Sequence, residues 1–212
     1  MAVSPRIVGL VALLVPAVAA TGIQGQGERL LLPLKEEIVR VQASAVNRIR
    51  KAQKEDGAFR SKHLREYPAG VTSLCMLALL NSGVSPDDPA IRGALDFVLR
   101  QPPKKTYSVA FRIMALDALT NDKPRLVEEI SASAAWLAKT FRSKGDMNRG
   151  NIGWGYPEGV PDLSIMQQAA YALHLAKKYG FDFKRENWRK LAKQVLKYQN
   201  KDGGFGYHRR DP

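Results

Sequence analysis

The sequence predicts an all-α protein built from repeated helical hairpins. Three observations lead to this fold class. The apolar residues recur at helical spacing, and no segment keeps the alternation of a β-strand. Helices with one charged face alternate along the chain with helices that are apolar nearly all round. A turn motif of the form Gln-x-x-Asp-Gly-x-Phe occurs twice, at residues 53–59 and 199–205.

The first 20 residues are expected to be a secretory signal peptide. Arg6 precedes an apolar run over residues 7–20, and Ala17 and Ala19 supply the small residues of a cleavage site. The run is shorter than the roughly 20 apolar residues that a membrane-spanning helix needs. An uncleaved N-terminal anchor is the alternative.

The Gly- and Gln-rich residues 21–32 are expected to be a linker, which leaves residues 33–212 as a single repeat domain. No later segment could cross a membrane without carrying charges into it. The mature chain is therefore expected to lack a transmembrane span and to be secreted or periplasmic.

Four amphipathic helices are predicted to form an outer layer. They span residues 34–52, 91–100, 130–141 and 187–198. In the second of them, Ile91, Leu95 and Val98 form an apolar stripe, whereas Arg92 and Asp96 lie on the opposite face. Such helices bury one face against a core and leave the other in water.

Three apolar helices are predicted to form an inner layer. They span residues 72–80, 107–119 and 163–176, and each begins with a Ser near a capping position. The two turn motifs lie 146 residues apart, or three steps of about 49 residues. This period suits a two-helix unit, so the chain is expected to hold about 3.5 helix pairs.

The two turn motifs have a physical rationale. Gly supplies the positive φ of a tight turn, and Asp can accept a hydrogen bond from its own backbone two residues on. The Gln amide can tie the end of an outer helix to the start of the next one, and the aromatic ring can cover it. The residues expected to take these structural roles are Gln53, Asp56, Gly57, Phe59, Gln199, Asp202, Gly203 and Phe205.

At these motifs the chain resembles the terpenoid cyclase and protein prenyltransferase superfamily. It is most similar to bacterial proteins with prenyltransferase/squalene-oxidase repeats, and the resemblance covers roughly residues 30–212. It implies an α/α toroid in which the QW-type motif is structural. A closed toroid of that superfamily has six helix pairs, so the chain is expected to be a fragment, an open half-toroid or half of a homodimer.

The catalytic signatures of that superfamily are missing. The acidic pair Asp87 and Asp88 lacks the rest of an Asp-rich acid motif and is better explained as a helix start. Cys75 has no acidic neighbour of the zinc-binding pattern and is expected to be a buried small hydrophobe. The three histidines, His63, His174 and His208, lack metal-ligand spacing. No metal site and no cofactor are therefore expected.

The candidate binding site is the mouth of the toroid, just before the third inner helix. Trp154 and Tyr156 are the candidate ligand-binding residues, and Asp162 could act as a general acid if apolar surroundings raised its pKa. The alternative is that Asp162 caps its helix and Trp154 packs as the aromatic of its repeat. Further candidates without an evident partner are Glu66, Tyr67 and Arg112.

The favoured function is an exported, non-catalytic binding or scaffold module for a protein or an apolar ligand. One alternative is a fragment of a squalene-type cyclase, and another is an exported polysaccharide lyase or glycosidase on an α/α barrel. Whether the chain is an enzyme stays open. Its net charge of +13 is concentrated in residues 177–212, which could bind acidic polysaccharide or anionic lipid or simply form a solvated helix face. Nucleic acid is the least expected partner of an exported protein.

Overall fold

The computed structural model describes residues 24–63, 65–119, 124–142, 152–155 and 161–206, with the side chains of its first helix described from residue 34 on. Within these residues the protein is helical and has no β-strand, which confirms the predicted all-α class. The helices are α2 (Gln24–Lys51), α3 (Pro68–Asn81), α4 (Pro89–Leu99), α5 (Thr106–Leu119), α6 (Pro124–Thr140), α7 (Leu163–Ala176) and α8 (Arg185–Val195), with short 3₁₀ helices η1 (Lys177–Tyr179) and η2 (Leu196–Tyr198).

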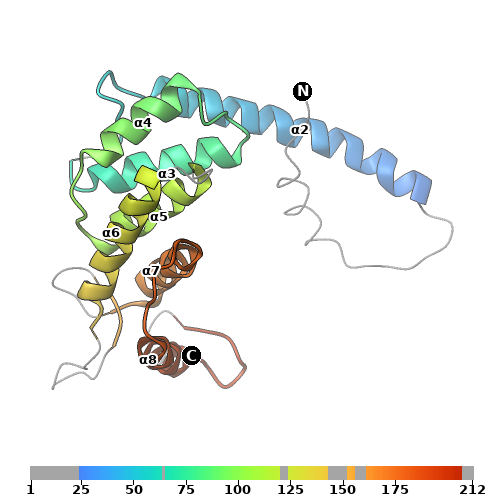
Figure 1. Ribbon diagram of the computed structural model, residues 1–212. Helices are drawn as coiled ribbons and strands as arrows, with labels where there is room; N and C mark the ends of the chain where they lie inside the picture. The colour runs from blue at the N-terminus through green and yellow to red at the C-terminus, as the bar shows by residue number, and fades with distance from the viewer. Residues whose placement is uncertain (1–23, 64, 120–123, 143–151, 156–160, 207–212) are drawn as a thin grey trace.

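The helices from α3 to α7 alternate between two layers, as the sequence predicts (Figure 1). The predicted first outer helix differs, because α2 projects from the body and buries none of its residues from 34 to 51. The inner helices α3, α5 and α7 pack side by side, and α5 lies between the other two. The helix α4 covers α3, and α6 covers α5 and α7. Because α5 has neighbours on three sides, nine of its residues are buried, among them the polar Ser108 and Arg112.

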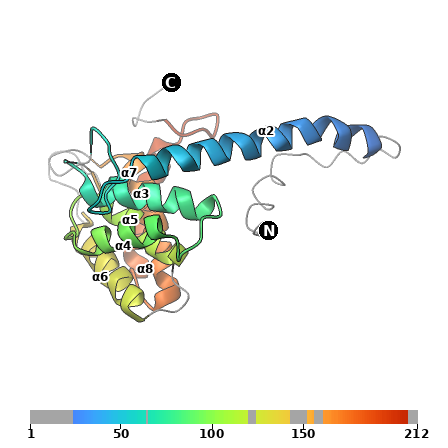
Figure 2. The same ribbon diagram turned by 90° about the horizontal axis from the view of Figure 1, so that it is seen from above.

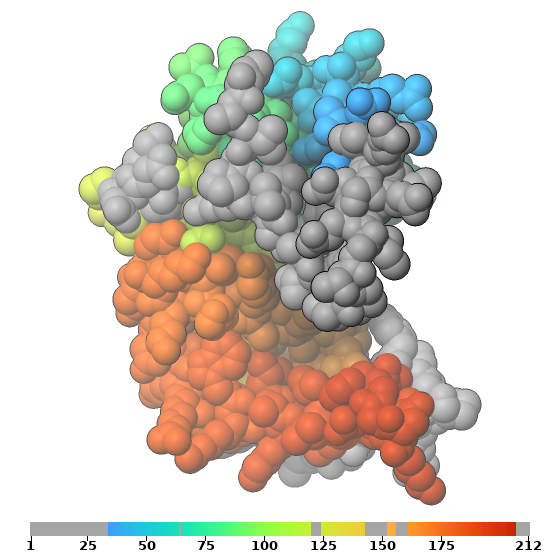
Figure 3. All heavy atoms as spheres, turned by 90° about the vertical axis from the view of Figure 1, so that its right-hand side faces the viewer, coloured from blue at the N-terminus to red at the C-terminus, as the bar shows by residue number. Residues whose placement is uncertain are grey.

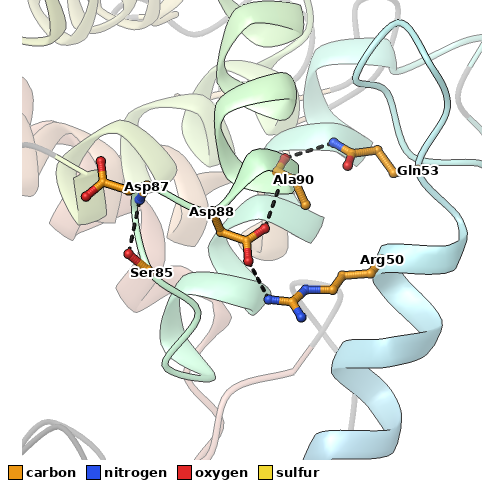
Figure 4. Close-up of polar contacts among 6 residues, drawn as sticks. All are labelled: Arg50, Gln53, Ser85, Asp87, Asp88 and Ala90. Carbon is orange, nitrogen blue, oxygen red and sulfur yellow. Dashed lines mark hydrogen bonds and ion pairs between the residues drawn. The ribbon is translucent and has the colours of Figure 1, made fainter.

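The starts of α4 and α7 are fixed by aspartate caps. Asp88 accepts a hydrogen bond from the Ala90 amide at 2.9 Å, and Pro89 occupies the first turn, where its missing N–H is no loss. The Arg50 guanidinium pairs with the second oxygen of Asp88 at 2.6 Å (Figure 4). Asp87 lies beside this cap, where its backbone amide donates to the Ser85 hydroxyl at 3.2 Å.

The first helix is longer than predicted. Since α2 begins at Gln24, the residues predicted to form a linker, 21–32, are helical from Gln24 on, and the helix continues through Pro33. Glu, Arg and Leu at residues 28–32 are good helix formers, which offsets the neighbouring Gly residues and the Pro. The predicted signal peptide, residues 1–20, lies outside the described residues. Of the helices that are described, none combines the length and the apolar character needed to span a bilayer.

Candidate functional site

The two turn motifs fold into the same structure. Each forms an isolated antiparallel bridge, between Gln53 and Phe59 in the first motif (residues 53–59) and between Gln199 and Phe205 in the second (residues 199–205). In each, the Gln side-chain amide donates to the carbonyl of the Gly four residues on, at 3.1 Å. The two glycines have φ values of +91° and +89°, which other residues rarely adopt.

The aspartates of the motifs are also used inside the turns. Asp56 accepts from the Ala58 amide at 3.0 Å, and Asp202 accepts from the Gly204 amide at 2.8 Å. The first of these bonds is the main cause that lowers the pKa of Asp56 below its ordinary value. These geometries favour a structural role for the motifs over a catalytic one.

The first motif also holds the start of the next outer helix, as the sequence analysis expected of its Gln. The Gln53 amide donates to the Ala90 carbonyl in the first turn of α4 at 2.8 Å (Figure 4). The Phe59 ring of the same motif is fully buried. One side chain thus closes its own turn and ties two successive outer helices together.

Trp154 lies in the core and not on a surface. It is 1% exposed, and its indole N–H donates to the Leu137 carbonyl of α6 at 2.9 Å. Its ring packs against Phe141 and Phe183, with centroids 4.8 and 5.8 Å away. This placement favours packing as the aromatic of its repeat and leaves no ring face for a ligand. Tyr156, the other candidate ligand-binding residue, lies outside the described residues.

Asp162 caps α7. Its Oδ1 atom accepts from the Ile165 amide at 2.9 Å and from the Ser164 hydroxyl at 2.6 Å. The Tyr107 hydroxyl of α5 donates in turn to the Ser164 oxygen at 2.7 Å. Both contacts are those of an N-cap side chain, which favours the capping role over that of a general acid.

The structure brings other residues together, in a cavity of about 400 Å³ between the N-terminal ends of α3 and α5. Its wall is mainly apolar and aromatic. The lining residues are His63, Glu66, Tyr67, Gly70, Val71, Leu74, Tyr107, Ser108 and Phe111. Gly70 lets the two helices approach closely, because a Cβ there would lie 2.6 Å from the Ser108 hydroxyl.

Two of the further candidates, Glu66 and Tyr67, lie at the rim of this cavity beside Lys105. The Lys105 ammonium pairs with Glu66 at 3.2 Å and lies 4.0 Å from the centre of the Tyr67 ring. A hydrogen bond from the Tyr67 phenol, followed by the one from Lys105, lowers the pKa of Glu66, and the same carboxylate raises the pKa of Tyr67. At neutral pH the rim therefore presents an ionised Glu66 carboxylate and a neutral Tyr67 phenol.

The third of these candidates, Arg112, is a structural residue of the helix layers. It is 4% exposed, its guanidinium donates to the Gln101 carbonyl at 2.6 Å, and it forms an ion pair with Glu129 of α6. It thus links α5 to the end of α4 and to α6 and does not line the cavity. The sequence did not predict this structural role, because a charged residue on an apolar helix can either line a cavity or pair with a charged residue of a neighbouring helix.

The cavity wall itself was missed by the sequence analysis. Val71, Leu74 and Phe111 belong to helices that are apolar nearly all round, so no periodicity separates their packed faces from their open ones. Leu74 is 47% exposed although it lies within a buried helix.

Of the histidines, His63 lines this cavity, and His174 lines a smaller one of about 280 Å³ between α7 and α8. His208 lies outside the described residues. Among the residues that the structure describes, no group of three or more His, Cys, Asp and Glu side chains could hold a metal ion.

Cys75 lies on α3 and is partly buried, close to the prediction of a small core hydrophobe. Burial raises the pKa of its thiol above the ordinary value. We expect iodoacetamide to alkylate the folded protein more slowly than the denatured chain, with the midpoint of the rate–pH profile at higher pH, because the thiolate is the nucleophile. Equal profiles for the two forms would contradict this placement.

The basic C-terminal region forms a stripe on α8 and η2. Arg185, Arg189, Lys193 and Lys197 recur every four residues, and all four are exposed. This geometry is compatible with both interpretations of the positive charge, a solvated helix face and a surface for polyanions.

Comparison of the chain with known protein families, with curated proteins and with solved structures found no match in any of the three. The paired turns, the cavity and the basic stripe are therefore the features from which its function is inferred.

Proposed function

We propose that this chain is an exported binding protein of the α/α-toroid type that holds an apolar ligand between the N-terminal ends of α3 and α5. The observation that supports the proposal is the cavity of about 400 Å³, which is lined by residues of the inner helices α3 and α5 and has a mainly apolar wall. Small-molecule sites have this character, with volumes of about 300–1,000 Å³ and a few polar groups that orient the ligand.

The ionisable side chains His63 and Glu66 reach the cavity from the segment before α3. Glu66 forms an ion pair with Lys105 at the rim. The apolar lining residues Val71, Leu74 and Phe111 belong to the helices α3 and α5. A ligand with an aliphatic or isoprenoid body and one polar end fits this division. Its body would displace water from the apolar wall, which contributes about 25 cal/mol per Å² of buried apolar area.

Binding is favoured over acid catalysis by the state of the nearby carboxylates. Alkene protonation needs a neutral carboxylic acid, whereas the hydrogen bonds to Glu66 lower its pKa, and Asp162 is engaged in capping α7. A glycosidase needs two carboxylates facing one site, and Glu66 is the one carboxylate among the described residues that line this cavity.

The proposal is tested with a dansyl-labelled decyl alcohol, whose fluorescence rises when it enters an apolar site. We expect saturable binding to the wild-type protein and at least a tenfold loss of affinity, or about 1.4 kcal/mol, for Leu74→Asp. A charge at residue 74 keeps water in the cavity and opposes burial of the chain.

Tyr171→Asp is the matched control, because Tyr171 is 54% exposed, lies on α7 and does not line the cavity, while Leu74 is 47% exposed. Both substitutions are on the surface, so both variants are expected to stay folded. Binding that is absent in the wild type, or that is weakened equally by both substitutions, would overturn the proposal.

A further inference from the structure

The turn of the first motif is packed closely against the outer helix α4. The start of α4 comes so close that a Cβ on Gly57 would lie 2.0 Å from the Gly93 carbonyl oxygen. Gln53 donates to Ala90 in the same helix, and the Phe59 ring of this motif has 0% exposure. An outer helix with a small residue at the contact is therefore the natural partner of this turn.

The second motif has the same turn but a bare surface. A Cβ on Gly203 would meet nothing within 4 Å, and Phe205, the counterpart of the buried Phe59, is 52% exposed. Leu196, on η2 just before the motif, is 59% exposed. Leu196, Gly203 and Phe205 define a C-terminal motif surface. The segment that carries them lies at one end of the molecule, coloured red in Figure 3. Within the described residues no helix occupies this surface.

The helix α2 carries the complementary face. When α2 and α4 are aligned by the Gln that follows each, Gln53 and Gln101, the position of Gly93 in α4 corresponds to Ala45 in α2. Ala45 is exposed, although its counterpart is the residue that touches the first motif.

This face continues toward the N-terminus as an apolar stripe. Leu34, Ile38 and Val41 lie on the same side of α2 as Ala45, and the first three are 53%, 49% and 57% exposed. The helix projects from the body in Figure 2, at the end of the molecule opposite to α8 in Figure 1. An exposed stripe of this length marks an interaction surface.

We propose that two copies of this chain associate in antiparallel orientation, with α2 of each copy lying on the C-terminal motif surface of the other. Each copy has one surface of each kind, so two antiparallel copies can make both contacts at once, and the pair then has two-fold symmetry. In each contact Ala45 takes the place that Gly93 has on the first motif, and the apolar stripe covers Phe205 and Leu196.

The first test measures the mass of the full chain in solution by light scattering over a range of concentrations. We expect the mass of two chains for the wild type and of one chain for Phe205→Asp and for Ile38→Asp. Tyr171→Asp is the matched control, since Tyr171 is an aromatic residue of 54% exposure on α7, outside the proposed contact. It is expected to remain a dimer.

The second test identifies the surfaces in contact. In a Cys75→Ser background, chains with Ala45→Cys are mixed with chains with Gly203→Cys under mild oxidation. We expect a disulfide between residues 45 and 203 of different chains, found by mass spectrometry of the digested dimer. Replacing Gly203→Cys by Asp117→Cys, which lies on α5, should abolish this cross-link.

Either test can overturn the proposal. A wild type with the mass of one chain at every concentration excludes the dimer, and larger polymers exclude a closed pair. A dimer that survives Phe205→Asp and gives no disulfide between residues 45 and 203 uses other surfaces. The ligand-binding proposal is unaffected by these outcomes, because Leu74 lies outside the contact.

Discussion

Gly57→Ala is expected to lower the free energy of unfolding by about 2–5 kcal/mol. Two effects add at this position. A left-handed backbone at φ +91° costs an L-residue about 1–2 kcal/mol, and forcing a methyl group against packed backbone costs about 1–3 kcal/mol more. The methyl group would meet the Gly93 carbonyl at 2.0 Å, so α4 must shift away from the first motif and from the Gln53 amide.

Gly203→Ala separates the two effects, because Gly203 has almost the same φ, +89°, and an open surface. Only the conformational effect of about 1–2 kcal/mol is expected there. The comparison is made by urea denaturation in the Phe205→Asp background, which keeps the proposed dimer contact from covering Gly203. Equal losses at the two glycines would show that the close approach of α4 contributes nothing to stability.

The repeat could be predicted from the sequence because its turn is encoded locally. Gly57 and Gly203 need a positive φ, and Asp56 and Asp202 bond to their own backbone, so the motif specifies one turn wherever it occurs. The two layers could be predicted for the same reason, because the distribution of apolar residues around each helix indicates how much of that helix is buried. The toroid-type closure is not local and stays a prediction.

The candidate site was harder to predict because it depends on what surrounds each residue. Trp154 follows a glycine-rich stretch, which is typical of an exposed loop, yet its ring fills the core between α6 and the segment before α8. Conversely, Leu74 has the sequence environment of a core residue and lies open at the cavity. Periodicity reports that a helix is buried, but it does not report which side of that helix lacks a neighbour.

Trp154→Ala is expected to lower the free energy of unfolding by about 3–5 kcal/mol. Removing a fully buried indole leaves a void among Phe141, Phe183 and Leu137 and also leaves the Leu137 carbonyl without its 2.9 Å hydrogen bond. Trp154→Phe keeps a ring in the cluster, so a smaller loss of about 1–3 kcal/mol is expected. Both values are measured by urea denaturation with the unfolding followed by circular dichroism.

The Trp154→Phe variant also decides between the two roles predicted for this residue. If Trp154 only packs, the variant loses stability and still binds the dansyl-labelled decyl alcohol with wild-type affinity at temperatures where it is folded. If the indole contacts the ligand, affinity falls although the fold is retained, as proposed for Leu74→Asp. A buried position of 1% exposure, away from the residues that line the cavity, makes the first result the expected one.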